Sequence, residues 1–281
     1  MNNEEPSAEL REINQQAREC WEANADWWDE QFGEGNRFQL DLIGPSTERL
    51  LALTPGDVVL DIACGNGAFS RRMAQLGASV VAFDFSERFL DRAKFRTTRN
   101  GELIQYANID ATDKAALLTL GKQRYDAAVC SMAFMDMATI EPILSALTEL
   151  LKEDGCLVFS VLHPCFNNSD GTRLAIEEAD QQGQLVTTHF VKVHRYITPS
   201  SSLGVGIPGQ PQPHMYFHRP ISELYNSCFR AGFVMEGIEE PTFQDTRSGA
   251  RGPFSWDNFR DIPPVLITKM RLSRKQRPNL S

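Results

Sequence analysis

The spacing of apolar residues along the chain alternates between a strand pattern and a helix pattern from residue 58 to residue 162. Short apolar runs, predicted as buried strands, are separated by segments with apolar residues at helical spacing. Near-continuous apolar strands alternating with helices indicate a parallel sheet covered on both faces. The predicted strands are 58–63, 79–85, 103–110, 125–132 and 156–162, and the predicted helices are 68–77, 87–101, 114–122 and 140–155.

This alternation breaks after residue 162. Residues 163–219 form a predicted insertion, with a strand or hairpin over 185–197 followed by a loop over 198–213. A helix over 220–233 and strands over 234–241 and 264–272 complete the pattern. The last two strands are joined without a helix, so we expect them to be antiparallel to each other. The sequence therefore predicts an α/β fold with a doubly wound sheet of seven strands.

An aromatic helix is predicted ahead of the sheet, within residues 11–39. Three of the four tryptophans lie in this segment, and Trp21, Ala25, Trp28 and Phe32 share one helix face. A helix with such a face must cover an apolar surface. We expect a helical cover over residues 1–45, a main domain over 46–272 that contains the insertion, and a basic tail over 273–281.

Composition and charge narrow the range of partners. Apolar residues make up 42% of the 281 residues, and the formal net charge is −9. An acidic chain has no general attraction for phosphate backbones, so no nucleic-acid partner is expected. The sequence has neither the apolar stretch of about 18 residues that spans a membrane nor the pattern of a signal peptide. The six cysteines show no metal-binding spacing. We therefore expect a cytoplasmic protein with no metal site and no membrane partner.

A glycine-rich turn, "DIACGNG", joins the first predicted strand to the first predicted helix. Asp61 lies four residues before Gly65, and Ser70 stands where a nicotinamide fingerprint has its third glycine. A carboxylate beside the turn disfavours a pyrophosphate and favours a positively charged ligand. Asp84 ends the second strand, where a carboxylate accepts the hydroxyls of a ribose. Asp110 ends the third strand, where a carboxylate can meet an adenine amino group.

With these motifs the sequence resembles a known family, the class I S-adenosylmethionine-dependent methyltransferases, and within it the UbiE-like group that acts on small molecules. The similarity covers residues 55–165 well and 218–272 more weakly. It implies a Rossmann-like fold, a methyltransferase activity and S-adenosyl-L-methionine as cofactor. The motifs that carry it are "VVLDIACGNG", "VVAFDFS", "ANIDAT", "YDAAVCSMAFMDM", "LLKEDGCLVFSVLHPCF" and "HRPISELYNSCFRAGF".

The resemblance implies a role for each residue of the glycine turn. Gly65 and Gly67 would let the backbone approach the methionine part of the cofactor. Asp61 would act near its amino group, and Ala63 would offer a carbonyl. Arg37, from the N-terminal segment, would meet the cofactor carboxylate, although it is equally typical of an ordinary surface cation.

The same resemblance implies the rest of the cofactor site. Asp84 would hold the ribose, and Phe85 would lie on the adenine. Asp110 and Ala111 would meet the adenine edge. Ser131 follows the fourth strand, where a backbone carbonyl usually binds the cofactor amine. Phe85 and Ser131 could instead be packing residues.

The methyl acceptor is expected near the ends of the fourth and fifth strands. Positioning can supply much of the rate of methyl transfer, and a base is needed only if the acceptor loses a proton. His163 is the candidate base, with a structural role in the turn as the alternative, and Asp136 is a second catalytic candidate that could instead cap a helix or face solvent. The expected pocket residues are Trp28, Phe134 and Met135. Catalysis by the thiol of Cys165 is disfavoured, because the motifs around it differ from those of cytosine methyltransferases.

Two functions from different classes remain open. The first is transfer of a methyl group to a small-molecule acceptor at oxygen, nitrogen or carbon. The second is a non-catalytic sensor or partner subunit that binds S-adenosylmethionine. Nicotinamide-dependent reduction is disfavoured by Asp61 and Ser70.

Overall fold

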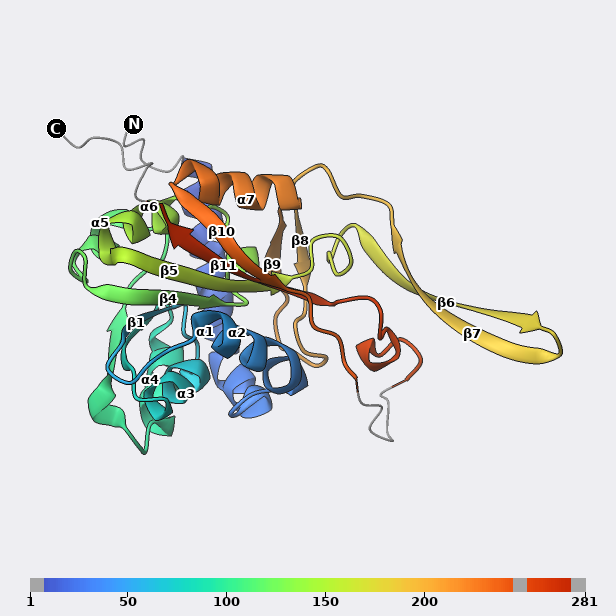
Figure 1. The fold of residues 1–281 in the computed structure, drawn as a ribbon, viewed down its shortest axis with the longest axis horizontal. Coiled ribbons are helices and arrows are strands. Elements are labelled where there is room, and N and C mark those ends of the chain that lie inside the picture. Colours follow the sequence, from blue (N-terminus) through green and yellow to red (C-terminus); the bar gives the residue numbers. More distant parts are fainter. Residues whose placement is uncertain (1–7, 245–251, 274–281) are drawn as a thin grey trace.

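A mixed sheet of seven strands forms the centre of the molecule, in the order β10-β11-β5-β4-β1-β2-β3 (Figure 1). The computed structural model describes residues 8–244 and 252–273. Strand β11 is antiparallel to both β5 and β10, so the predicted seven strands and the antiparallel last pair are confirmed. The strands are β1 (Val58–Ile62), β2 (Ser79–Asp84), β3 (Ile104–Asn108), β4 (Tyr125–Ser131), β5 (Leu151–Leu162), β10 (Phe233–Glu239) and β11 (Val265–Leu272).

Helices cover both faces of the sheet, which explains why the strands are almost continuously apolar. Neighbouring residues of β1 pack into two different hydrophobic clusters: Leu60 belongs to the first cluster and Val59 to the second. The first cluster contains the inner face of α6, and the second contains residues of α2 and α3 such as Met73. The helices are α2 (Gly44–Leu51), α3 (Ala68–Gln75), α4 (Glu87–Arg96), α5 (Lys114–Leu118), α6 (Glu141–Leu150) and α7 (Ile221–Arg230).

The predicted helices of the domain end earlier than their sequence pattern indicates, α4 and α6 by the largest margin. Helix α6 stops at Leu150, not at Gly155, because Leu151 already pairs with Tyr125 of β4. Gly155 lies within β5, where an added Cβ would come within 3.0 Å of the Leu151 Cβ. Helix α4 begins after Ser86, whose hydroxyl caps it by accepting the Phe89 N–H, and ends at Arg96.

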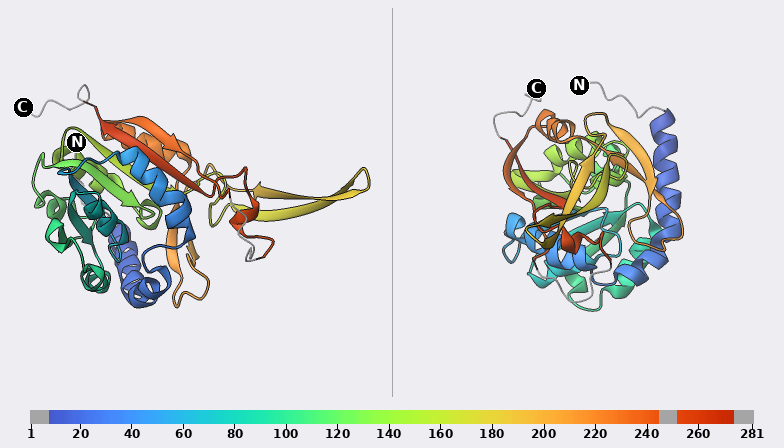
Figure 2. Two further views of the ribbon diagram at one scale, coloured as in Figure 1. Left: turned by 60° about the horizontal axis from the view of Figure 1, so that its bottom comes forward. Right: turned by 90° about the vertical axis from the view of Figure 1, so that its right-hand side faces the viewer.

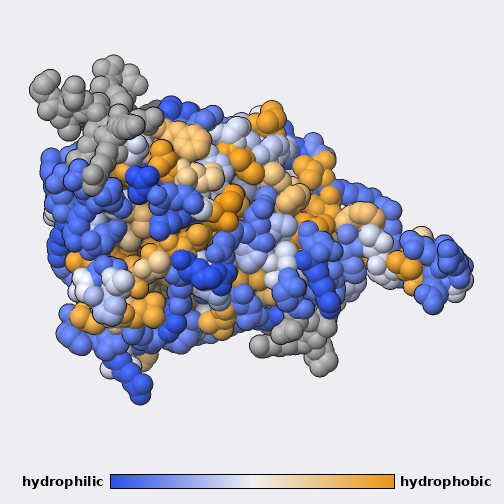
Figure 3. Space-filling view, in the orientation of Figure 1, coloured by the Kyte–Doolittle hydropathy of each residue, from blue (hydrophilic) through white to orange (hydrophobic). Residues whose placement is uncertain are grey.

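The insertion after β5 contains two hairpins. Strands β6 (Thr172–Gln181) and β7 (Gln184–Val193) pair as a long ribbon that projects from the body, and its surface is mostly hydrophilic (Figures 1 and 3). Strands β8 (Ser200–Gly204) and β9 (His214–His218) form the second hairpin. The predicted loop over 198–213 is therefore wrong in its first part. The serine-rich β8 has no apolar alternation, and its strand form depends on pairing with β9.

The N-terminal helix α1 (Ala8–Phe32) runs along one side of the molecule, next to α4 and β9 (Figure 2). It ends before Gly33, whose φ of +57° lies in the left-handed region that ends many helices. A π-helical turn over Phe38–Ile43 leads into α2. The tail predicted over residues 273–281 lies, from residue 274 onward, outside the residues that the structure describes. In the described part of the chain no helix has the length and apolar character needed to cross a membrane.

Candidate functional site

A cavity of about 520 Å³ lies between the carboxyl ends of the central strands and helix α1. It is centred on β1 and β4, where the strand order reverses direction. In open α/β sheets this switch point is the usual ligand position, and the volume is typical of small-molecule sites. Eleven of the residues predicted for the site line it: Trp28, Asp61, Ala63, Gly65, Asp84, Phe85, Asp110, Ala111, Ser131, Met135 and Asp136.

The two glycines of the turn between β1 and α3 have different roles. Gly65 has a φ of +53°, and no atom lies within 4 Å of the position that its Cβ would take. It therefore leaves open space on the cavity side. Gly67 does not line the cavity. A Cβ there would lie 2.6 Å from the Tyr106 hydroxyl and 3.0 Å from the Ala93 Cβ. Gly67 is thus required by packing against α4 and β3.

Asp84 connects the end of β2 to the glycine turn. Its Oδ2 accepts a hydrogen bond from the Gly65 N–H at 2.9 Å, and its Oδ1 accepts one from the Ser86 N–H at 2.9 Å. Burial raises the pKa of Asp84 to about 6, although these N–H groups act in the opposite direction. The carboxylate keeps further lone pairs that can accept hydroxyl groups of a ligand.

Asp61 lies at the end of β1 and is buried. The hydroxyl of Ser70 donates to its Oδ2. Burial raises the pKa of Asp61 to about 7, the Ser70 hydrogen bond lowers it, and the nearby Asp84 raises it further. A buried carboxylate with a raised pKa favours a cationic partner, because a positive charge compensates for the lost hydration.

A third carboxylate, Asp110, follows β3 and is already partly satisfied. Its Oδ1 accepts hydrogen bonds from the N–H and the hydroxyl of Thr112 at 2.8 Å each. Its Oδ2 accepts one from the Asn14 amide of α1 at 2.6 Å. Asn14 also lines the cavity, and no sequence motif predicts this position.

Backbone strain marks two strand ends at the cavity. Ala63 after β1 has a φ of +52°, and Met132 after β4 has a φ of +56°. Residues other than glycine rarely adopt this conformation, and such strain is concentrated at functional sites. Both residues line the cavity, next to Ser131.

Helix α1 closes the cavity and is held at several points. Asn24 and Gln212 of the β8–β9 loop exchange two hydrogen bonds of 2.8 and 3.1 Å. Asp29 is 1% exposed and accepts hydrogen bonds from Arg92 at 2.7 Å and from the Asn66 amide at 2.9 Å. Arg96 binds the same carboxylate. The helix is therefore fastened to α4, to the glycine turn and to the insertion.

Opposite the carboxylates of β1 and β2, Asp136 and His214 face each other across 3.7 Å, measured from Asp136 Oδ1 to His214 Nε2. Both residues line the cavity, as do Trp21 and Tyr216. The ring centroids of Trp21 and Tyr216 each lie 4.3 Å from that of His214. No sequence pattern predicted a role for His214. Its local indication, alternation with Tyr216 on one face of a short strand, does not stand out without the paired strand β8.

Four predicted residues are not brought to this cavity, namely Arg37, Gly67, His163 and Phe134. Arg37 donates to Asp41 at 3.2 Å and to Asp257, and it lies over the Phe243 ring. Both ring nitrogens of His163 are used: Nδ1 accepts from the Cys165 N–H at 3.2 Å, and Nε2 therefore donates to Glu240 at 2.8 Å. This geometry fits the alternative role of His163 in the turn.

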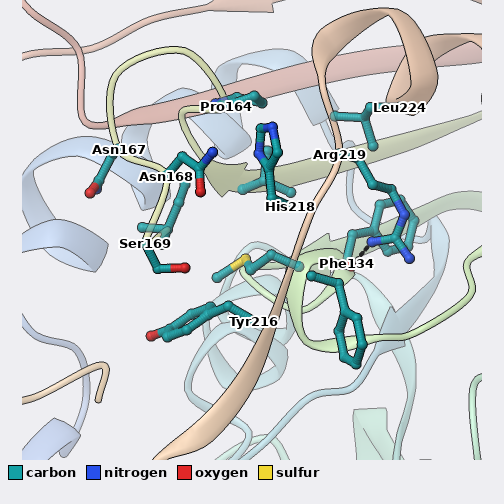
Figure 4. A pocket seen from close by; sticks show the side chains of 13 residues that line it. Phe134, Pro164, Asn167, Asn168, Ser169, Tyr216, His218, Arg219 and Leu224 are labelled. Atoms are coloured by element: carbon teal, nitrogen blue, oxygen red, sulfur yellow. Dashed lines mark hydrogen bonds between the residues drawn. The ribbon is translucent and has the colours of Figure 1, made fainter. Parts of the chain in front are cut away.

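Phe134 is fully buried and lines a second cavity of about 40 Å³ beside the first (Figure 4). Tyr216 and Met135 line both cavities. The buried guanidinium of Arg219 lies at the edge of this small cavity and donates to the Phe134 carbonyl at 2.9 Å. It also donates to the Met137 and Ala138 carbonyls at 2.6 and 3.0 Å. These bonds fix the short helical turn η3 (Phe134–Asp136).

Comparison with known families decides the class of this site. Residues 59–155, from β1 into β5, match the family model described as a methyltransferase domain. The chain carries a class I S-adenosylmethionine-dependent methyltransferase domain. The matched segment contains the glycine turn, Asp84, Asp110 and Asp136.

Relatives and solved structures extend the similarity beyond this segment. The methyltransferase is 27% identical over 205 residues to a ubiquinone biosynthesis O-methyltransferase of Salmonella paratyphi A, covering 72% of this chain and 82% of the relative. It is similar in fold to an S-adenosylmethionine-dependent methyltransferase of Mesorhizobium loti, with a TM-score of 0.63, 24% identity and coverage of 81% and 96%. A 1,6-didemethyltoxoflavin-N1-methyltransferase of Burkholderia thailandensis shares the fold with a TM-score of 0.59, 17% identity and coverage of 96% and 93%.

The cavity of the methyltransferase fits the cofactor of this class. S-adenosylmethionine carries a sulfonium, an ammonium, a ribose and an adenine. Burial raises the pKa values of the Asp61 and Asp84 carboxyl groups, so a cationic ligand in the cavity would favour their charged forms. Gly65 leaves room for the ligand on the cavity side.

Proposed function

We propose that this methyltransferase transfers a methyl group from S-adenosylmethionine to a small-molecule acceptor held under helix α1. The observation that carries the proposal is one cavity lined by two chemically different groups of residues. The first group is the buried carboxylates and the glycine turn, and the second is the aromatic rings with the Asp136–His214 pair. In this proposal the first group forms the cofactor end and the second the acceptor end. Bound at the cofactor end, S-adenosylmethionine supplies a methyl group on a positively charged sulfur.

The cofactor roles follow from chemistry and position. Asp84 accepts the ribose hydroxyls, and Asp61, oriented by Ser70, attracts the amino group. Phe85 lies against the adenine. The remaining groups that bind or shape the cofactor end are Ala63, Gly65, Asp110, Ala111 and Ser131. Arg37 and Gly67 have no such place in the proposal, because neither lines the cavity.

A small acceptor suits the acceptor end of the cavity. Helix α1 of the predicted cover and the β8–β9 hairpin of the 163–219 insertion both contribute lining residues. Hydrogen bonds between Asn24 and Gln212 join these two parts. Aromatic lining residues favour a flat ligand. The net charge of −9 also disfavours a nucleic-acid acceptor.

Related proteins support the same class of acceptor without fixing the methylated atom. The Salmonella relative is named as an O-methyltransferase, and the Burkholderia structure is of an N1-methyltransferase with bound 1,6-didemethyltoxoflavin and S-adenosylhomocysteine. Oxygen and nitrogen acceptors both occur among similar proteins.

A labelling experiment tests the proposal. S-adenosylmethionine labelled in its methyl group is incubated with the protein and, in parallel, with a small-molecule extract, total RNA and DNA. Label in the small-molecule fraction is expected. Label in nucleic acid alone, with a salt-sensitive rate, would contradict the proposal. Tight cofactor binding without any transfer would favour a non-catalytic binder instead.

A further inference from the structure

The acceptor end of the cavity contains a carboxylate oxygen without a hydrogen-bond partner. Among the residues that the structure describes, Asp136 Oδ1 is the one buried, unpartnered side-chain oxygen or nitrogen that belongs to the cavity lining. A buried acceptor without a partner is costly, so a ligand that donates a hydrogen bond to it is favoured. The turn that carries Asp136 is held by Arg219, which keeps the carboxylate in place.

The neighbouring His214 has one defined tautomer, which the hydrogen-bond network assigns. Gln210 Oε1 accepts from the Trp28 indole N–H and from the Gly206 N–H, both at 3.0 Å. The Gln210 amide nitrogen is therefore the group that faces His214 Nδ1 at 2.9 Å, and it donates. With Nδ1 as acceptor, the proton of the neutral ring is on Nε2, the atom that faces Asp136.

This tautomer divides the roles within the pair. Because Nε2 already carries a proton and Nδ1 is occupied, His214 cannot take a proton from a ligand. Its neutral Nε2–H faces the carboxylate at a distance too long for a hydrogen bond. Asp136 Oδ1 is thus the free proton acceptor at this end, 3.7 Å from the imidazole.

The walls around the pair suit a flat ring. Trp21 and Trp28 meet edge to face with centroids 5.4 Å apart, and Tyr216 lies on the other side of His214. Aromatic side chains bind planar ligands by stacking or edge contacts. The titratable groups around Asp136 are Cys20 of α1, Cys130 of β4, and His214 and Tyr216 of β9.

We infer that Asp136 is the general base of this enzyme and that its acceptor is a planar aromatic compound with a hydroxyl or ring N–H to be methylated. This inference rests on the proposed function. The acceptor's proton passes to Asp136 Oδ1, its heteroatom's electron pair forms the bond to the methyl carbon, and the electron pair of the broken carbon–sulfur bond stays on sulfur. His214, Gln210 and Trp28 are positioning residues.

A pair of binding probes tests the inference without turnover. In the presence of S-adenosylhomocysteine, titration calorimetry measures the affinity for 4-methylphenol, which like a tyrosine side chain keeps its proton up to about pH 10, and for its methyl ether 4-methylanisole, which has no proton to donate. We expect the phenol to bind about tenfold more tightly, since hydrogen bonds to charged groups have that magnitude. Equal affinities in the wild-type protein would overturn the inference.

Asp136→Asn is the matching variant, with Asp91→Asn on the exposed face of α4 as control. Asp136→Asn should remove the preference for the phenol and slow label transfer to the extract about 100-fold, the typical effect of a lost general base. Its calorimetric affinity for S-adenosylmethionine should stay within about twofold. The wild-type transfer rate should rise with pH, because burial raises the pKa of Asp136 and the base acts in its ionised form.

The outcomes separate this inference from the proposed function. Transfer that is unchanged in Asp136→Asn would overturn the general base and leave methyl transfer intact. No transfer by the wild-type protein, together with a clear preference for the phenol, would overturn the proposed function and support the binding role of Asp136.

Discussion

Ser70 donates a hydrogen bond to the buried carboxylate of Asp61. Ser70 stands where a dinucleotide fingerprint has its third glycine, and Asp61 is an acid that such a fingerprint lacks. The hydroxyl crosses from the first turns of α3 to the end of β1. It limits a pKa that burial raises to about 7. Ser70 and Asp61, the two differences from a pyrophosphate-binding turn, thus form one hydrogen-bonded pair. This pair suits a cationic ligand.

Cofactor affinity should therefore depend on pH near neutrality. Ionised Asp61 attracts an ammonium group, and protonated Asp61 does not. Because its pKa is raised to about 7, calorimetry should show affinity for S-adenosylmethionine falling as the pH decreases below this value, by up to about tenfold per pH unit. Asp84, with a pKa of about 6, adds a second step at lower pH.

Two variants isolate the contribution of Asp61. Ser70→Ala removes a hydrogen bond that lowers the pKa of Asp61, so the midpoint should move to higher pH. Asp61→Asn should bind more weakly and lose the step near pH 7. An affinity that is constant from about pH 6 to pH 8 in the wild-type protein would rule out this linkage.

Asp84→Asn should weaken S-adenosylmethionine binding about tenfold or more. A charge-assisted hydrogen bond is worth about 1.5–3 kcal/mol, and the amide keeps a single acceptor oxygen. Titration calorimetry measures the change, with the exposed Asp91→Asn as control. Unchanged affinity in a folded Asp84→Asn variant would remove Asp84 from the ribose site.

His214 should remain neutral far below the usual range of histidine. Burial lowers its pKa to about 4, against about 6.5 for an exposed histidine. Nitrogen NMR of labelled protein should report the Nε2–H tautomer from neutral pH down to about pH 5. Gln210→Leu leaves Nδ1 without its donor and should allow the other tautomer. A mixture of tautomers in the wild-type protein would contradict the assigned network.

The attachment of α1 through Asp29 should contribute measurably to stability. Asp29→Asn leaves Arg92 and Arg96 without their shared buried anion, and we expect the free energy of unfolding to fall by about 2 kcal/mol. Burial raises the pKa of Asp29, but hydrogen bonds from Arg96, Asn66 and Arg92 outweigh this effect and lower the pKa. The difference between the proteins should therefore be present at neutral pH, begin to shrink near about pH 4 and disappear as the pH falls through the lowered pKa of Asp29 in the folded protein.

Urea unfolding of both proteins measures this difference. Asp26→Asn is the control on the same helix, since Asp26 is 58% exposed and its ion pairs with Arg88 and Arg92 are 3.8 and 3.7 Å long. Its effect should be below about 0.5 kcal/mol. Equal stability of Asp29→Asn and wild type would show that the helix is held by its aromatic face alone.

The carboxylate side of the cavity could be predicted because its signals are local. Asp61, Gly65 and Asp84 each lie at the end of an apolar run, and parallel strands bring such ends to one edge of a sheet. The same logic did not identify that Gly67 and His163 lie outside the cavity lining. Gly67 is adjacent to the site in sequence, but its missing side chain makes room for Tyr106. His163 follows a strand end, but its ring turns toward Glu240.

The acceptor end was not predictable because it depends on long-range pairing. His214 reaches the cavity through β9, whose partner β8 has no strand pattern of its own. The tautomer of His214 depends on Gln210, and Gln210 is held by Trp28, which is 182 residues from Gln210 in the sequence. Side-chain periodicity carries no information on such contacts, since they form only when α1 and the insertion meet across the sheet.

A crystal structure with S-adenosylhomocysteine tests the central claim most directly. The ribose hydroxyls should lie on Asp84, the amino group near Asp61, and the sulfur should face the space in front of Asp136 and His214. Soaked 4-methylphenol should place its oxygen beside Asp136 Oδ1. A cofactor bound outside the cavity, or with its sulfur directed away from Asp136, would contradict both the assigned cofactor site and the role of Asp136.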